Sequence, residues 1–315
     1  MSHMRLSITI AAITVTLAIA GCSAPAPAAD GRLRVVATTT QVGSIAGEIG
    51  GDAIDLTVLL APGAEAHDYE MTPSAAAAVE DADLVLRSGA GLESWLDDAL
   101  ETIGGGEATR DMSLGVTLRE AAESEDADHA DEGDEHGVDP HYWLSASNAI
   151  RMVENVRAAL VEAHPSEASA FDERAAGLVG RLEDADGEIR ALMGEIPEDR
   201  RGIVTNHDAL GYFIDEYGLR FVGSVFPSLD VAAEPSPGEL ADLIETIRAE
   251  RVSAIFSESA VSPELARAVA DETDAVLVDE PLYTDSLGPE GSGVDTLDGM
   301  LLHNATVIHG ALVEG

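Results

Sequence analysis

The chain has 315 residues, of which 45% are hydrophobic and only 4% aromatic. This length predicts two packed units, with cores built mainly from Ala, Val, Leu and Ile. Acids outnumber bases by 59 to 17, every base is an arginine, and the formal net charge is -42. Such a charge argues against nucleic acids as partners and favours the attraction of cations. Adaptation to high salt, or solubility alone, explains the acidity equally well, so the charge locates no site.

The segment 1–22 has the features of a secretion signal. Arg5 precedes an apolar run that ends at Ala20, and this run is too short for a comfortable membrane-spanning helix. The last six residues of the segment 1–22, LAIAGC, resemble a bacterial lipobox. This resemblance implies that Cys22 is acylated and becomes the mature N-terminus. A buried apolar helix is the alternative. We expect an exported protein, lipid-anchored on the outer face of the cell membrane or in the periplasm, with a flexible Pro/Ala tether over 23–32.

Strand and helix patterns alternate over 33–145, which we predict to be an N-terminal α/β lobe. Alternation of this kind predicts a parallel sheet flanked by helices. The expected strands cover 33–39, 55–60 and 83–88, and the expected helices cover 44–49 and 72–80.

An acidic segment, residues 120–139, interrupts this lobe. Between Glu123 and His136 there are eight acids and two histidines, His129 and His136, but no base and no aromatic. Like-charge repulsion and the lack of apolar side chains predict a mobile loop. Two interpretations stay open: a loose collector of cations, with His129 and His136 as its histidines, or a solvated acidic loop.

A long helical pattern over 146–196, interrupted at Pro165 and closed by Pro197, predicts one linking helix between two lobes. The C-terminal lobe, 197–315, repeats the α/β pattern of the first. Its expected strands cover 202–205, 219–222, 252–256 and 275–278, and its expected helices cover 237–248, 263–270 and 301–312. The predicted fold class is therefore α/β, with two parallel-sheet lobes joined by one long backbone helix.

Three histidines occur in predicted loops rather than in helices. His67 follows the second strand, His141 precedes the linking helix, and His207 follows the first strand of the second lobe. Ligands bind outside the carboxyl ends of parallel strands, so His67 and His207 could converge on one cleft. Asp285, after the last predicted strand, is the best-placed carboxylate. Three neutral imidazoles and one carboxylate suit a single tetrahedral Zn²⁺, whereas manganese favours more oxygen ligands.

Five motifs of the chain resemble those of the zinc/manganese solute-binding proteins of bacterial ABC importers. In the family's order they are PGAEAHDYE from Pro62, GLESWL from Gly91, DPHYWL from Asp139, NHDALGYF from Asn206 and DSLG from Asp285. The resemblance runs from about residue 33 to the C-terminus. It implies two α/β lobes, a rigid connecting helix and a metal held between the lobes.

The same resemblance places the metal ligands on His67, His141, His207 and Asp285. Zinc members of the family carry histidine at the position of His207, where many manganese members carry glutamate. Two features depart from the usual pattern. Ala66 stands where proline commonly precedes the first histidine, and the acidic loop is shorter and poorer in histidine than the zinc loops of some relatives.

The resemblance thus implies a receptor, not an enzyme, that binds one Zn(II) and delivers it to an ABC permease and its ATPase. Mn(II) is the alternative cargo, and a metallochaperone is a further candidate partner. We expect a monomer, held to the membrane by its lipid anchor and binding no nucleic acid. A secreted zinc hydrolase is a rival, but the sequence has no His-Glu-x-x-His motif, and Asp285 would close the metal to water. A cell-adhesion role is open to a surface lipoprotein, although no motif encodes a partner surface.

Overall fold

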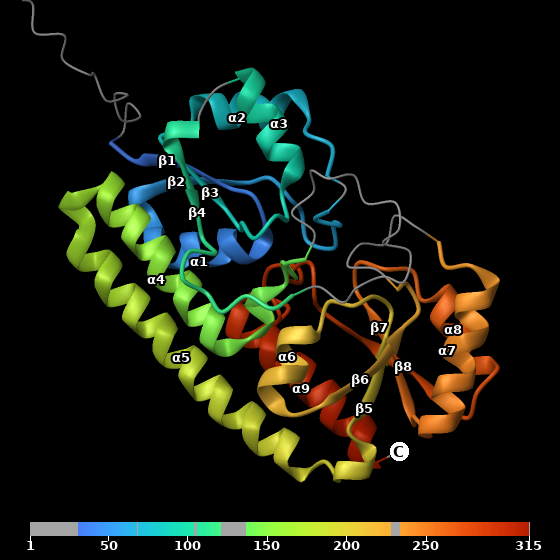
Figure 1. Cartoon of the computed structure of the whole chain (residues 1–315). Helices are drawn as coiled ribbons and strands as arrows, with labels where there is room; N and C mark the ends of the chain where they lie inside the picture. Colours follow the sequence, from blue (N-terminus) through green and yellow to red (C-terminus); the bar gives the residue numbers. More distant parts are fainter. Residues whose placement is uncertain (1–30, 68, 104–105, 121–136, 228–233, 315) are drawn as a thin grey trace, which may run out of the picture.

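The computed structural model describes residues 31–67, 69–103, 106–120, 137–227 and 234–314. It contains two four-stranded parallel sheets with helices on both faces, and one long helix runs beside both of them (Figure 1). The α/β class predicted from the sequence is confirmed. Within the described part of the chain, no helix combines the length and the apolar character needed to cross a membrane. The predicted signal with Cys22, and the acidic stretch with His129 and His136, lie outside the described residues.

The N-terminal sheet has the strand order β2-β1-β3-β4. Its strands are β1 (Leu33–Ala37), β2 (Ile54–Val58), β3 (Leu84–Arg87) and β4 (Thr109–Asp111). The two central strands, β1 and β3, are mostly buried, as expected for parallel strands with helices on both faces. The short edge strand β4 was missed in the sequence because three residues give no measurable periodicity.

Helices cover both faces of this sheet. They are α1 (Thr40–Gly50), α2 (Pro73–Asp81) and α3 (Ser94–Ile103), the last of which the sequence analysis did not predict. Helix α1 begins four residues earlier than expected because the Thr39 hydroxyl accepts from the backbone N–H of Val42 (3.3 Å) and caps the helix. On the face of α2 and α3, a small apolar cluster joins Val36, Val85 and Leu96.

The expected linking segment contains two helices, α4 (Ala146–Ala163) and α5 (Ala168–Glu195). Pro165 lies in the turn between them, and α5 packs beside α4 as it runs along both lobes (Figure 1). The guanidinium of Arg174 donates to the carbonyl of Ile49 at the end of α1 (2.9 Å), and that of Arg190 pairs with Glu216 of the second lobe (2.9 Å). Helix α5 is therefore the element that contacts both lobes.

The C-terminal sheet has the order β6-β5-β7-β8. Its strands are β5 (Gly202–Thr205), β6 (Arg220–Ser224), β7 (Ala254–Glu258) and β8 (Val276–Leu282). Its helices are α6 (Gly211–Tyr217), α7 (Pro237–Glu250), α8 (Glu264–Asp271) and α9 (Leu297–Glu314). Strand β8 extends four residues beyond the predicted end and includes Pro281, which is tolerated because β8 is an edge strand.

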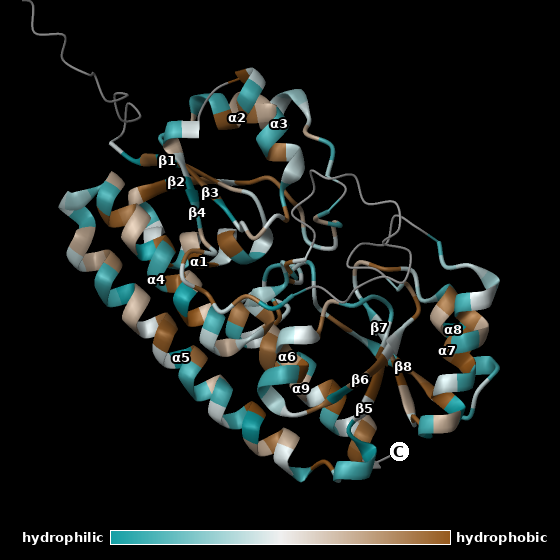
Figure 2. Cartoon of the chain, in the orientation of Figure 1, coloured by the Kyte–Doolittle hydropathy of each residue, from teal (hydrophilic) through white to brown (hydrophobic). Residues whose placement is uncertain are grey.

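One large apolar core joins the two lobes. It includes Val156 of α4, Leu182 of α5 and Met300 of α9, together with buried residues of both sheets. Apolar and polar residues alternate along α5, as the colours of Figure 2 show, so this helix has an apolar face for the core. The relative position of the lobes is therefore set by a continuous hydrophobic interior.

Candidate metal centre

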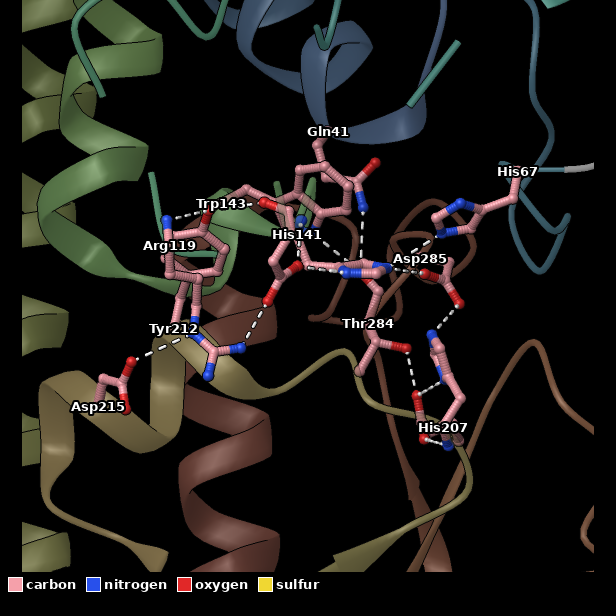
Figure 3. Close-up of polar contacts among 12 residues, drawn as sticks. Gln41, His67, Arg119, His141, Trp143, His207, Tyr212, Asp215, Thr284 and Asp285 are labelled. Atoms are coloured by element: carbon pink, nitrogen blue, oxygen red, sulfur yellow. Dashed lines mark hydrogen bonds and ion pairs between the residues drawn. The ribbon is translucent and has the colours of Figure 1, made fainter. Parts of the chain in front are cut away.

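The structure brings together the four side chains that the sequence singled out as ligands. His67 lies in the loop after β2, His141 in the turn before α4, His207 after β5 and Asp285 after β8 (Figure 3). The carboxyl ends of the two sheets meet here, where ligands bind to parallel sheets.

The distances between the ring nitrogens and carboxylate oxygens are short and similar. Nε2 of His67 lies 3.2 Å from Nε2 of His141, which lies 3.2 Å from Oδ1 of Asp285. Nε2 of His207 lies 3.4 Å from Oδ2 of Asp285. A tetrahedral ion with ligands at 2.0–2.1 Å separates its ligand atoms by about 3.4 Å. The observed spacing therefore fits the ligand atoms of His67, His141 and Asp285 around one small cation, with His207 beside the other oxygen of Asp285.

Nε2 of His67 and Nε2 of His141 are hydrogen-bonded to each other, but the carboxylate of Asp285 is not fully satisfied. Oδ1 of Asp285 is buried and has no hydrogen-bond partner among the described residues, although Nε2 of His141 is near. His141, His207 and Asp285 are all at least 97% buried, whereas His67 is only partly buried. His67 is thus the ligand candidate nearest the solvent.

Each fully buried imidazole has a carboxylate on its far side. Asp139 lies 2.8 Å from Nδ1 of His141 and also accepts from the backbone N–H of His141 (3.0 Å). Glu258 lies 2.8 Å from Nδ1 of His207 and accepts from the backbone N–H of His207 (2.9 Å). Carboxylates in this position fix the ring so that Nε2 is presented to a metal. The sequence analysis assigned a role to neither carboxylate.

Arg119 connects Asp139 to the second lobe. Its guanidinium lies 2.9 Å from Asp139 and 3.2 Å from Asp215 of α6. Tyr212, also on α6, donates to the backbone carbonyl of Asp139 (2.6 Å) and accepts from the backbone N–H of Arg119 (3.0 Å). The segment that carries His141 is therefore attached to both lobes.

The loop that carries Asp285 is held mainly by residues of the first lobe. The backbone carbonyl of Thr284 accepts from the indole N–H of Trp143 (2.8 Å) and from the side-chain amide of Gln41 (3.3 Å). The hydroxyl of Thr40 accepts from the backbone N–H of Leu287 (2.8 Å). These contacts fix the position of Asp285 relative to His141.

Neighbouring charges strongly shift the pKa values of His141, His207 and Asp285. Burial lowers the pKa of His141, but Asp139 and Asp285 outweigh it and raise that pKa to about 9. For His207, burial likewise lowers the pKa, yet Glu258 and Asp285 raise it well above its usual 6.5. Burial raises the pKa of Asp285, but the two imidazoles bring it well below its usual value. The site therefore stabilises positive charge at its centre.

The set of donors could hold a metal ion. Two overlapping groups have ligand atoms close enough for one ion: His67, His141 and Asp285 form the first, and His207, Glu258 and Asp285 form the second. The first group has two imidazoles and one carboxylate, a set that suits transition metals rather than calcium or magnesium, whereas the second has one imidazole and two carboxylates.

Comparisons with known proteins agree with this chemistry. The family model described as "Zinc-uptake complex component A periplasmic" matches residues 35–311. The chain is 31% identical to the manganese-binding lipoprotein MntA of Bacillus subtilis, over 98% of this chain and 100% of the relative. It is 32% identical to the iron-binding protein YfeA of Yersinia pestis, over 84% and 81%. It is also 32% identical to the zinc-binding lipoprotein AdcA of Streptococcus pneumoniae, over 78% of this chain but 48% of the relative.

Solved structures show the same fold. The periplasmic zinc-binding protein TroA from Treponema pallidum superposes with a TM-score of 0.80 and 26% identity, covering 90% of this chain and 99% of that one. The Mn-bound periplasmic metal-binding protein from Candidatus Liberibacter asiaticus gives 0.77 and 25%, covering 89% and 100%. Relatives and structural neighbours thus include proteins named for zinc, manganese and iron.

Proposed function

The chain belongs to the zinc-uptake component A family of metal solute-binding proteins, which serve ABC importers and are not enzymes, and from this premise we propose that it captures one Zn(II) for import. His67, His141, His207 and Asp285 are the proposed ligands. The observation that carries the proposal is the spacing of 3.2–3.4 Å between donor atoms from four separate loops. The recipient is an ABC permease with its ATPase.

The preference for zinc rests on the ligand types. Three imidazoles and one carboxylate form the four-ligand set typical of Zn²⁺, whereas Mn²⁺ is more often bound by additional oxygen atoms. Manganese is the second candidate cargo because relatives named for manganese match almost the whole chain. Competition titration of the metal-free protein with both ions decides between them. Tighter binding of Mn²⁺ than of Zn²⁺ would refute the zinc preference.

Capture and handover involve no covalent chemistry. Asp285 supplies one negative charge against two on the ion, and the imidazoles bind only when they are neutral. Because the ligands come from both lobes, release requires that at least one ligand-bearing loop move away from the others. Contact with the permease is the event that we expect to cause this movement.

Single substitutions test the ligand set. We expect His67→Ala, His141→Ala and His207→Ala each to weaken Zn²⁺ binding by orders of magnitude, measured by calorimetric titration against a competing chelator. Metal content of protein purified without added metal, measured by mass spectrometry, should show one ion per chain. Normal binding by two of the three variants would remove the proposed site.

Two proposals concern segments that lie wholly or mostly outside the described residues. Acylation of Cys22 would anchor the protein to the membrane, and Cys22→Ser should move it from the membrane fraction to the soluble fraction. The acidic segment 120–139, with His129 and His136, would collect zinc loosely. Deletion of 123–136 should then slow zinc transfer from a donor chelator, and an unchanged rate would refute the collector.

A further inference from the structure

Glu258, the last residue of β7, is a buried carboxylate whose two oxygens are both in use. Oε1 accepts from the backbone N–H of His207 (2.9 Å). Oε2 accepts from the hydroxyl of Thr284 (2.7 Å) and lies 2.8 Å from Nδ1 of His207, a close contact that is outside hydrogen-bond geometry in the metal-free site. Glu258 is 2% exposed and Thr284 is 1% exposed. A carboxylate at such a depth is stable only when its oxygens are satisfied in this way.

These contacts place Glu258 behind His207 rather than in the ligand set. It approaches Nδ1, whereas Asp285 approaches Nε2 on the other side of the same ring. A proton on Nδ1 that faces Glu258 leaves the lone pair on Nε2 free for a metal ion.

Thr284 extends this contact to the first lobe. Its hydroxyl donates to Glu258, while its backbone carbonyl accepts from the side chains of Trp143 and Gln41 (Figure 3). Trp143 lies two residues after His141, and Thr284 directly precedes Asp285. Thr284 therefore contacts both the group that orients His207 and the segment that carries His141.

We propose that Glu258 is a positioning residue for metal capture, which fixes the His207 ring with Nε2 toward the ion, and that Thr284 joins this residue to the first lobe. The proposal rests on the proposed function, because it assumes that His207 is a ligand. It assigns to Glu258 no bond to the metal.

Glu258→Gln is the decisive variant. Glutamine has one acceptor oxygen where Glu258 uses two, so its amide N–H must face either the backbone N–H or Nδ1–H of His207. If the amide faces the backbone N–H, two donors oppose each other there and the segment is strained; if it faces Nδ1, the ring state with Nδ1–H and a free Nε2 is disfavoured. With Co²⁺ as the probe, we expect the dissociation constant to rise about 10- to 100-fold. The visible absorption of the Co²⁺-saturated variant should match that of the wild type, because the four ligands are unchanged.

Glu93→Gln is the matched control. Glu93 is fully buried and also uses both oxygens: Oε1 accepts from Thr38 and the backbone of Ser88, and Oε2 accepts from the backbone of Gly89. Its hydrogen-bond partners include no imidazole among the described residues. This variant should lose thermal stability as Glu258→Gln does, yet bind Co²⁺ within about two-fold of the wild type.

A second pair of variants leaves the carboxylate in place, in case Glu258→Gln does not fold. Thr284→Val keeps the size of the side chain but removes the hydroxyl that donates to Glu258, and it should weaken Co²⁺ binding about five-fold. Thr284→Ser keeps the hydroxyl and should restore binding to the wild-type level.

The outcomes separate this inference from the function that it assumes. Failure of the wild type to bind one Co²⁺ or Zn²⁺ would overturn both. With normal wild-type binding, an affinity of Glu258→Gln or Thr284→Val within two-fold of the wild type overturns the positioning role alone. A changed Co²⁺ spectrum at saturation also overturns it, since Glu258 would then be a ligand. An equal loss in Glu93→Gln overturns it as well, because a general loss of structure would explain the result.

Discussion

The two buried imidazoles of the site share one design but differ in charge balance. His141 and His207 each have a carboxylate within 2.8 Å of Nδ1 and Asp285 near Nε2. Behind His141, the charge of Asp139 is balanced by Arg119 at 2.9 Å. Behind His207, the other groups that donate to the carboxylate of Glu258 in the described structure are neutral, a hydroxyl and a backbone N–H.

This difference shows how the site distributes its negative charge. Arg119 offsets only part of the charge of Asp139, because it also pairs with Asp215, whereas Glu258 and Asp285 have no arginine partner among the described residues. A divalent ion bound by neutral imidazoles would meet both of these carboxylates, and its two positive charges would offset theirs. Burial of a charged group is tolerated only with such compensation. The half of the site in the second lobe therefore contributes two carboxylates whose charge no arginine of the described structure offsets.

The largest effect should follow from removing the ligand that both halves share. Asp285→Asn keeps the shape of the side chain but removes the one carboxylate that lies near Nε2 of both His141 and His207. Loss of one partner from a buried charge cluster costs about 3–5 kcal/mol, on the order of 1,000-fold in affinity. Calorimetric titration with Zn²⁺ measures it. A loss below ten-fold would show that Asp285 is not a ligand.

The next largest effect is the pH dependence of metal binding. In the metal-free protein the pKa is about 9 for His141 and well above 6.5 for His207, so both rings are protonated at pH 7. Metal binding must displace these protons, and affinity should therefore rise with pH until about pH 9. We expect the release of about two protons per Zn²⁺ at pH 7. Calorimetry in buffers with different ionisation enthalpies counts the released protons. If no proton is released, both rings are neutral in the metal-free protein and the charge comparison above is wrong.

The same pKa shifts predict that the thermal stability of the metal-free and of the metal-loaded protein depends on pH in different ways. A histidine whose pKa is raised by folding adds stability below its unfolded pKa of 6.5, and this stability is lost as pH rises through the folded pKa of about 9. The melting temperature of the metal-free protein should fall by on the order of 5 °C over this range. The melting temperature of the zinc-loaded protein should not fall in parallel, because zinc binding strengthens as pH rises. Parallel curves in scanning calorimetry would argue against protonated rings in the metal-free site.

Much of this molecule could be predicted from local sequence patterns. The alternation of strand and helix patterns predicted the α/β class, and the positions of His67 and His207 after strands predicted one cleft. Short elements were missed, because β4 and α6 offer too few residues to show a period. The linking segment was expected as one helix, although Pro165 marked the turn that divides it.

The support of the ligands was harder to predict than the ligands themselves. Asp139 is two residues from His141, and that spacing was a usable local signal. Glu258 is 51 residues from His207 and 26 from Thr284, so only the parallel order of β5 and β7 brings them together. Contacts of this kind depend on strand order, which a single sequence does not specify.

The smallest effect should come from making the two halves of the site alike. Arg119→Gln removes the positive charge beside Asp139, so His141 would face an unbalanced carboxylate, as His207 does. The pKa of His141 should then rise above about 9 in a histidine NMR titration of the metal-free protein, while Zn²⁺ affinity at pH 9 changes less than ten-fold. Arg181→Gln is the matched control, because Arg181 also bridges two carboxylates, Glu48 and Asp298, but on the exposed surface of α5. An equal rise of the His141 pKa in both variants would mean that overall net charge, rather than the local balance at Asp139, sets the proton affinity of the site.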